Sequence, residues 1–273
     1  MSDDLVKLVR KSFERNEASL KTQFLNSEKE VGVRYCFLDD FLPEDIAQKV
    51  YKAFPAPDQM RLMKSLKEVK YTSKNFDAFD PLLKAVTFAI QHPDVIKVVE
   101  RITGIQPQQG DDTLYAGGLS LMAKGNYLNP HIDNSHNMQR DQYRTLNLLY
   151  YTTPDWELAC GGNLELWDRS VTRNATIVSR FNRMVLMETN PWSWHSVSPV
   201  VSEKFRTCVS NYYFSPESPI KKPYFNVTSF QGRPGQHIRR AWLPVESRLR
   251  MLLRVLRPGG FGRKDVYEPG NNS

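Results

Sequence analysis

The sequence of 273 residues contains only three cysteines, and no two of them form a CxxC pair. Cys36, Cys160 and Cys208 therefore predict neither a disulfide framework nor a thiolate zinc site, and they favour a reducing compartment. The charged N-terminal stretch lacks the apolar segment of a signal peptide, and no apolar run approaches the roughly 20 residues that cross a bilayer. We therefore expect a cytoplasmic protein without a transmembrane segment.

Acidic residues are fewer than basic ones, with 30 Asp and Glu against 37 Lys and Arg, for a net charge of +7. The excess lies mainly after Lys221 and does not spread over the whole fold, which weighs against specific nucleic-acid binding. Base-stacking aromatic residues, which nucleic-acid repair requires, do not cluster near His131. A small molecule or a peptide is the expected partner, and the sequence leaves the oligomeric state open.

The first 105 residues are predicted to be mostly helical, with one strand over residues 31–38 and a polar loop over residues 71–75. Apolar residues at helical spacing, or a proline near the first turn, predict helices over residues 3–26, 43–53, 81–91 and 93–104.

From residue 114 onward, short β-prone runs alternate with Gly, Asn and Pro. The predicted strands span residues 117–123, 144–152, 163–167, 175–181, 183–188 and 206–215. Helices followed by many short strands predict an α+β fold, a double-sheet jelly roll or barrel with the N-terminal helices buttressing one sheet.

We expect one structural domain made of a helical support (1–105), a strand-rich catalytic core (106–218) and an irregular basic tail (219–273). Residues 246–256 of this tail predict a short basic amphipathic helix docked on the domain. Peripheral contact with a membrane surface or with a partner is the alternative for that helix. Residues 259–273 are expected to be frayed.

The chemistry of the chain centres on His131 and Asp133, whose spacing directs both side chains from one face of a strand. His195 precedes the last long β-prone run, and Arg206 begins that run. Two histidines and one carboxylate can occupy one face of a ferrous ion and leave three positions for O2 and the two oxygens of 2-oxoglutarate. A buried arginine suits the far carboxylate of 2-oxoglutarate. By alternation, Cys208, Ser210 and Tyr212 share the face of Arg206, and Lys204 is the other candidate cation.

Several motifs of the sequence resemble those of a known family. They are Gly125-Asn126, His131-Ile132-Asp133-Asn134, Arg144 leading into Leu149-Tyr150-Tyr151, Asp155-Trp156, Gly161-Gly162-Asn163-Leu164, His195-Ser196-Val197-Ser198-Pro199, and Arg206 to Phe214. The stretch from 119 to 215 resembles the prolyl 4-hydroxylase-like Fe(II)/2-oxoglutarate-dependent dioxygenases.

The resemblance implies a double-stranded β-helix and a hydroxylase that uses Fe(II), 2-oxoglutarate and O2, with ascorbate as an optional reductant. It implies His131, Asp133 and His195 as iron ligands, and Arg206 with Tyr151 as the binding groups for the C5 carboxylate of 2-oxoglutarate. The carboxylate of Asp133 favours hydroxylation over halogenation, because halogenating relatives carry Gly or Ala at that position. The hydroxylated C–H bond belongs to a small molecule or to a peptidyl residue such as proline.

The sequence departs from the family pattern at three positions: Ala123 replaces a tyrosine, Asn147 a threonine and Cys208 a serine of some members. A non-catalytic double-stranded β-helix that binds a metal or a ligand is the alternative function.

The substrate mouth is expected beside the metal ligands. Its candidate residues are Asn134, Arg144, Trp192 and Trp194. For the two tryptophans, packing that fixes the loop before His195 is the favoured interpretation. Arg144 is expected either to bind an acidic substrate or to pair with Asp141 or with Asp133. The polar loop 136–143 is a candidate lid in which His136 is expected to be solvated.

Overall fold

The computed structural model describes residues 2–115, 117–256 and 266–267, and for residues 2 and 254–256 it describes the backbone alone. The expected fraying of residues 259–273 thus falls almost wholly outside the described residues. The helices are α1 (Ser2–Asn26), α2 (Glu28–Val31), α3 (Glu44–Lys52), α4 (Pro81–Ile90), α5 (Pro93–Thr103) and α6 (His237–Leu256), with short 3-10 turns at Pro57–Gln59, Phe76–Ala78 and Leu158–Cys160. No helix in the described part is long and apolar enough to cross a membrane.

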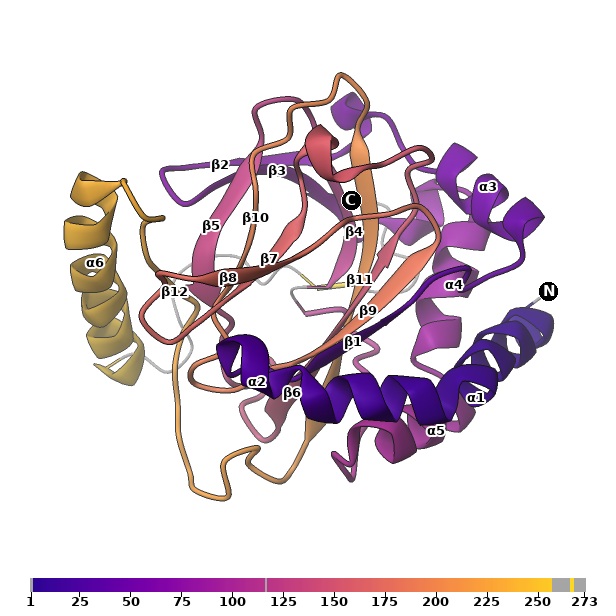
Figure 1. Ribbon diagram of the computed structural model, residues 1–273, viewed down its shortest axis with the longest axis horizontal. Coiled ribbons are helices and arrows are strands. Elements are labelled where there is room, and N and C mark those ends of the chain that lie inside the picture. Colours follow the sequence, from indigo (N-terminus) through magenta and orange to yellow (C-terminus); the bar gives the residue numbers. More distant parts are fainter. Residues whose placement is uncertain (1, 116, 257–265, 268–273) are drawn as a thin grey trace.

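In the part of the chain that the structure describes, twelve strands form one curled antiparallel sheet. They are β1 (Tyr35–Leu38), β2 (Arg61–Lys64), β3 (Glu68–Ser73), β4 (Gly118–Met122), β5 (Tyr127–Ile132), β6 (Tyr143–Tyr151), β7 (Leu164–Trp167), β8 (Asn174–Ile177), β9 (Arg183–Glu188), β10 (His195–Val197), β11 (Arg206–Ser215) and β12 (Ser229–Phe230). Their order is β1-β9-β6-β11-β4-β3-β5-β10-β7-β8, with β2 added to β3 and β12 added to β5. The sheet curls on itself, with α1, α4 and α5 on one side and α6 on the other (Figure 1). The predicted double-stranded β-helix with buttressing helices is confirmed.

Strand alternation sorts the long central strands into two faces. On β6, Leu146, Leu148 and Tyr150 pack into the core shared with α1, α4 and α5, whereas Leu149 and Tyr151 belong to a second cluster on the opposite face. Burial of one face of β6 under the helices therefore directs Tyr151 into the interior of the curled sheet.

Several sequence-based assignments differ from the structure. The first 105 residues contain three strands, β1, β2 and β3, where one was expected. The expected loop at 71–75 is wrong, because residues up to Ser73 belong to β3, which pairs with β2, β4 and β5. These partners lie far away in sequence, so the pairing of a polar run is decided by tertiary contacts. Residues 28–31 form α2, which ends at Gly32 with a φ of 78°, so the first strand begins only at Tyr35. Helix α6 begins at His237 and continues through Pro244, nine residues before the predicted start at 246.

Asn182 joins the sheet to the N-terminal region. It lies in the turn before β9 with a φ of 58° and is buried. Its Oδ1 accepts hydrogen bonds from Leu42 N and from the Tyr150 hydroxyl, each at 3.0 Å, and its Nδ2 donates to Leu42 O at 2.7 Å. The side-chain amide of Asn182 thus forms hydrogen bonds with the backbone N–H and C=O of Leu42, in the segment that leads from β1 into α3.

We predict that Asn182→Ala lowers the free energy of unfolding by about 2–4 kcal/mol, because three buried hydrogen bonds lose their partner. Urea denaturation measures the effect. The control is Asn174→Ala, which removes an exposed amide at the start of β8 and should change stability by less than about 0.5 kcal/mol. Equal stability of the two variants would contradict the role assigned to Asn182.

Candidate metal centre

The pairing of β5 with β10 brings the three predicted metal ligands together. His131 lies near the end of β5, and Asp133 follows directly after that strand. His195 is the first residue of β10 and stands opposite His131 in the antiparallel register. Residues that are distant in sequence therefore become neighbours because two short strands share hydrogen bonds.

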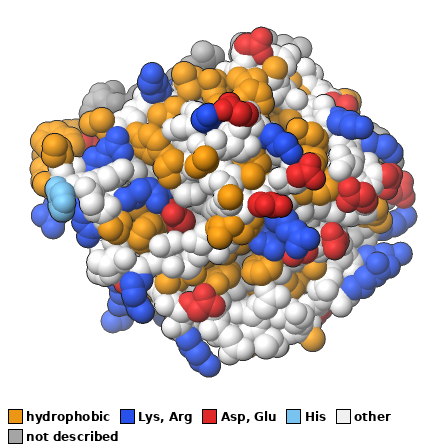
Figure 2. Space-filling view, turned by 45° about the horizontal axis from the view of Figure 1, so that its top comes forward, with side chains coloured by type: hydrophobic (Ala, Val, Ile, Leu, Met, Phe, Trp, Pro, Cys, Tyr) orange, Lys and Arg blue, Asp and Glu red, His pale blue; other side chains and the backbone are white. Residues whose placement is uncertain are grey.

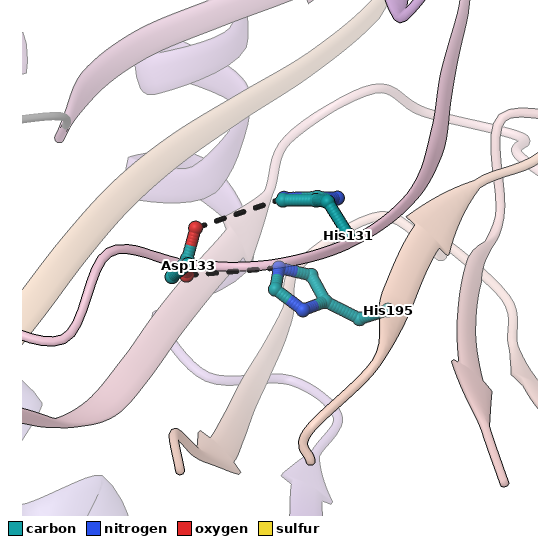
Figure 3. Close-up of side chains that lie close together, drawn as sticks. All are labelled: His131, Asp133 and His195. Carbon is teal, nitrogen blue, oxygen red and sulfur yellow. Dashed lines mark ion pairs between the residues drawn. The ribbon is translucent and has the colours of Figure 1, made fainter. Parts of the chain in front are cut away.

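The three side chains converge on one point, as Figure 3 shows. Asp133 Oδ1 lies 3.6 Å from His131 Nε2, and Asp133 Oδ2 lies 3.7 Å from His195 Nε2. One ligand atom from each residue falls within 4.8 Å of the others. All three side chains are buried, with exposed fractions of 4–8%. This spacing suits a single ion held by all three residues.

Backbone carbonyls orient both imidazole rings. His131 Nδ1 lies 3.0 Å from Asn129 O, and His195 Nδ1 lies 3.0 Å from Ser193 O. A carbonyl oxygen only accepts, so each Nδ1 carries the proton and each Nε2 presents its lone pair toward Asp133. The same arrangement of a second hydrogen bond fixes the ring of most metal-binding histidines.

The charges at this site also suit a metal. Burial alone raises the pKa of Asp133, but Arg144 and the two histidines outweigh it and hold the pKa below its usual value. Arg144 Nη1 lies 3.5 Å from Asp133 Oδ2. Burial, together with the neighbouring His195, lowers the pKa of His131 to about 3. An ionised carboxylate and a neutral imidazole are the protonation states that a divalent cation requires.

The surroundings of Asp133 Oδ2 indicate whether the three side chains suit a bound cation. This oxygen is buried and accepts no hydrogen bond. A buried carboxylate oxygen without a hydrogen-bond donor is costly, and a cation between it and the two Nε2 atoms removes that cost. The donor set of two nitrogens and a carboxylate matches the facial arrangement used by non-haem Fe(II). The residues present therefore fit a ferrous ion.

A cavity of about 450 Å³ extends from this centre into the curled sheet. Arg206, Cys208, Ser210 and Tyr212 of β11 line it, so the shared face expected from alternation is confirmed. Asn147 also lines the cavity, so two of the three positions that depart from the family pattern, Asn147 and Cys208, lie beside the metal centre.

Arg206 is the buried cation of this cavity, with an exposed fraction of 3%. Its Nε donates to Ser179 Oγ at 3.2 Å, and its Nη1 contacts the Met122 sulfur at 3.8 Å. A thioether is a weak acceptor, so the guanidinium keeps donors for a carboxylate. Tyr151 lies beneath it, with the guanidinium carbon 4.7 Å from the ring centroid. The Tyr151 hydroxyl is buried beside Arg206 and Ser179 without a hydrogen bond of normal geometry.

Lys204, the other candidate cation, lies outside the cavity. Its ammonium is exposed and pairs with Asp155 at 3.1 Å on the surface. Alternation places Lys204 and Arg206 on the same face, but the start of the β-prone run at Arg206 favours Arg206 as the cation. In the structure β11 begins at Arg206, and Lys204 lies in the exposed loop before it.

The candidate substrate residues divide into two groups. Asn134 lines the metal cavity and also a neighbouring cavity of about 460 Å³ formed with the loop that follows it. Arg144 lies behind Asp133, with its guanidinium carbon 3.9 Å from the Tyr212 ring centroid, and so takes the pairing role that the sequence left open. The tryptophans lie elsewhere: Trp192 packs under Arg169, and Trp194 lines a groove beneath α6.

The expectation of a solvated His136 is wrong. Its exposed fraction is 9%, its Nδ1 lies 2.7 Å from Ser135 Oγ, and its ring packs against Tyr143. Aromatic residues of the segment 224–225, which is remote in sequence, also lie near the ring. The polar residues around His136 in the sequence therefore gave no indication that it is buried.

Sequence reasoning missed four cations of the cavity wall. Lys67 and Lys70 come from the hairpin β2–β3, Lys74 follows β3, and Arg250 comes from α6. The alternating run that contains Lys70 was the available signal for the hairpin, but no local pattern places α6 near the metal ligands.

The low pKa of His131 predicts a pH dependence for the metal-free protein. Below about pH 6.5 the unfolded chain protonates this imidazole, whereas the folded protein resists protonation down to about pH 3, so stability falls as pH falls through this window. The measurement is made on protein from which a chelator has removed the metal. As the pH falls through this window, the free energy of unfolding of the wild type should decrease more steeply than that of His131→Gln, by up to about 1.4 kcal/mol for each pH unit. Urea titrations at several pH values measure the difference, and parallel curves would contradict the prediction.

Comparison with known proteins shows what the core of the chain is similar to. Residues 117–214 match the family model of the 2OG-Fe(II) oxygenase superfamily. Mouse prolyl 3-hydroxylase OGFOD1 is 28% identical over 90 residues, which cover 30% of this chain and 16% of that protein. The chain therefore corresponds to less than a fifth of the length of this relative.

Solved structures share the fold. A prolyl-4-hydroxylase from Pseudomonas putida superposes with a TM-score of 0.53 at 12% identity, covering 71% of this chain and 97% of that one. A prolyl 4-hydroxylase from Phytophthora capsici gives a TM-score of 0.51 at 17% identity, covering 77% and 67%. The matched region contains His131, Asp133, His195 and Arg206, so the core of the chain is similar to the 2OG-Fe(II) oxygenase superfamily, and the solved structures show that it shares their fold.

Proposed function

We propose that this protein is an Fe(II)- and 2-oxoglutarate-dependent dioxygenase that hydroxylates an unactivated C–H bond. The observation that carries the proposal is the buried cluster of His131, Asp133 and His195, with both Nε2 atoms and a carboxylate oxygen that accepts no hydrogen bond directed at one point. The family match over residues 117–214 supports the same chemistry. Three free cysteines among the described residues agree with the cytoplasmic location that we propose.

In this function each side chain has a separate task. His131, Asp133 and His195 hold Fe(II), and Arg144 keeps Asp133 ionised and oriented from behind. Arg206 binds the C5 carboxylate of 2-oxoglutarate with two N–H donors, and the buried Tyr151 hydroxyl donates to the same group. Bound iron with 2-oxoglutarate and O2 supplies the oxidation of C–H to C–OH, with succinate and CO2 as the other products.

The protein also controls water and substrate access. Apolar residues of the curled sheet surround Arg206, so a bound carboxylate exchanges water for a fixed cation in a medium of low dielectric constant. The substrate approaches past Asn134, which borders both the metal cavity and the neighbouring one.

We propose a prolyl residue of a polypeptide as the first substrate to test, with a small molecule as the alternative. The names of the mouse, Pseudomonas and Phytophthora relatives, all prolyl hydroxylases, support this choice. A panel of proline-containing peptides and free small molecules, screened for substrate-dependent succinate formation with mass detection of an added oxygen, separates the two classes.

Removal of a metal ligand should abolish turnover. We predict that His131→Ala and Asp133→Ala each lower succinate release by more than about 100-fold, because the facial ligand set is broken. Anaerobic titration with Fe(II) and 2-oxoglutarate checks the same site through its absorption band in the visible range. Unchanged turnover in both variants would remove the proposed centre. A protein that binds metal and 2-oxoglutarate but oxidises nothing would be the non-catalytic binding module.

The two candidate cations provide a matched test of cosubstrate binding. We predict that Arg206→Gln raises the KM for 2-oxoglutarate by roughly 10–100-fold, since a buried charge-assisted pair is lost. Lys204→Gln removes an exposed charge and should leave the KM unchanged. The reverse ranking would assign the carboxylate site to Lys204.

A further inference from the structure

Helix α6 turns its apolar side chains toward solvent. Six large apolar residues have exposed fractions between 45% and 85%: Ile238, Trp242, Val245, Leu249, Leu252 and Leu253. A helix on the surface of a globular protein ordinarily buries such a face against the core. In α6 most large apolar side chains face solvent instead. Among the described side chains of the helix, Leu243 is the apolar residue that is fully buried.

The exposed residues form one continuous band, which we call the outer stripe. Steps of four and three residues lead from Ile238 to Leu252, and Leu253 widens the band to an arc of about 100° at 100° per residue. This arc is wider than the narrow seam of a simple helix pair. The outer stripe is therefore a broad apolar strip along the whole helix.

Polar contacts on the opposite side hold the helix in this orientation. Arg240 donates to Val171 O at 3.0 Å, and Arg250 donates to Thr228 O at 2.8 Å. Ser247 Oγ accepts from Phe230 N at 3.1 Å, and Glu246 pairs with Lys67 at 2.7 Å. These bonds connect α6 to β12 and the core, so the outer stripe cannot turn inward without breaking them.

The charge around the outer stripe has one sign. Four arginines have described side chains on α6: Arg239, Arg240, Arg248 and Arg250. The single acid of the helix, Glu246, is already paired with Lys67 and Arg250. At 100° per residue, Arg239 and Arg248 lie about 90° to either side of the midline of the stripe. Arg173 of the adjoining loop, whose side chain is 79% exposed, pairs with Asp168 at 3.7 Å, so this acid, like Glu246, is already paired. On the left edge of Figure 2, where Figure 1 places α6, hydrophobic side chains lie among lysines and arginines.

We propose that the outer stripe docks on an anionic lipid surface, with α6 lying in the plane of the interface. A broad apolar face that contains tryptophan and leucine, bordered by arginine on both sides, is the pattern of an interfacial helix. Anionic headgroups complement the arginines, whereas a second copy of this chain would bring charges of the same sign. Because Arg250 of the same helix lines the metal cavity, docking holds that cavity beside the lipid surface.

Vesicle binding tests the proposal. The full chain is mixed with phosphatidylcholine vesicles, with and without phosphatidylserine, and sedimented. We expect binding to the phosphatidylserine vesicles that weakens by at least about tenfold when Trp242→Ser and Leu249→Ser are combined. Arg248→Gln should weaken it more modestly and reduce its salt dependence. The control is Leu25→Ser on α1, which removes a leucine as exposed as Leu249, 54% against 53%, and should bind like wild type.

Three outcomes overturn the proposal. They are absence of binding to phosphatidylserine vesicles, equal binding to neutral vesicles, and a loss of binding in Leu25→Ser as large as in the double variant. A dimer in sedimentation velocity that the double variant abolishes, without lipid binding, would assign the stripe to a second copy. Thermal melting and anaerobic Fe(II) titration of each variant verify that its fold and metal centre are intact, so that a loss of lipid binding reports on the stripe itself.

Discussion

The antiparallel pairing of β5 with β10 is the constraint on which the site depends. It sets His195 opposite His131, and it leaves Asp133, just beyond the end of β5, with a carboxylate that faces both rings. A shift of one residue in either strand would turn its histidine to the opposite face of the sheet. The register is supported on both sides, because β10 also pairs with β7 and β5 also pairs with β3 and β12.

The three side chains that this strand pairing brings together are buried, which affects the charge of Asp133 most. A carboxylate removed from water is costly unless charge or hydrogen bonds compensate it. Arg144 supplies part of that compensation through its ion pair with Asp133 Oδ2, and the proposed metal ion would supply the rest. Arg144 itself contacts both Asp133 and the ring of Tyr212, so the ionised state of Asp133 depends on packing as well as on charge.

The interior of the curled sheet and the outer face of α6 differ in polarity. The curled sheet encloses polar and charged groups directed at one another, with Arg206 and the ligand cluster lining the same cavity. Helix α6 carries the opposite arrangement, with arginines bound to the body of the protein and apolar residues facing outward. Arg250 connects the two, because it anchors the helix to Thr228 and also lines the metal cavity. The position of α6 therefore bears on access to the metal centre as well as on the outer surface of the protein.

Much of the site could be predicted from sequence because its signals are local. The spacing of His131 and Asp133 requires only that the chain be extended there, and alternation along β11 places Cys208, Ser210 and Tyr212 with Arg206. Alternation did not separate Arg206 from Lys204, and the local signal that favoured Arg206 was the start of the β-prone run, where β11 begins. The buried state of His136 was hidden, because its covering residues come from a segment that is distant in sequence.

The ligand types, the class of the fold and the strand alternation that directs side chains inward could all be predicted from the sequence, because they follow from residue chemistry and from the periodicity of the backbone. The pairing of distant strands, the insertion of β3 between β4 and β5 and the exposure of the apolar stripe of α6 arise only in the folded chain. Long-range pairing depends on the packing of the whole chain, and no window of neighbouring residues contains that information.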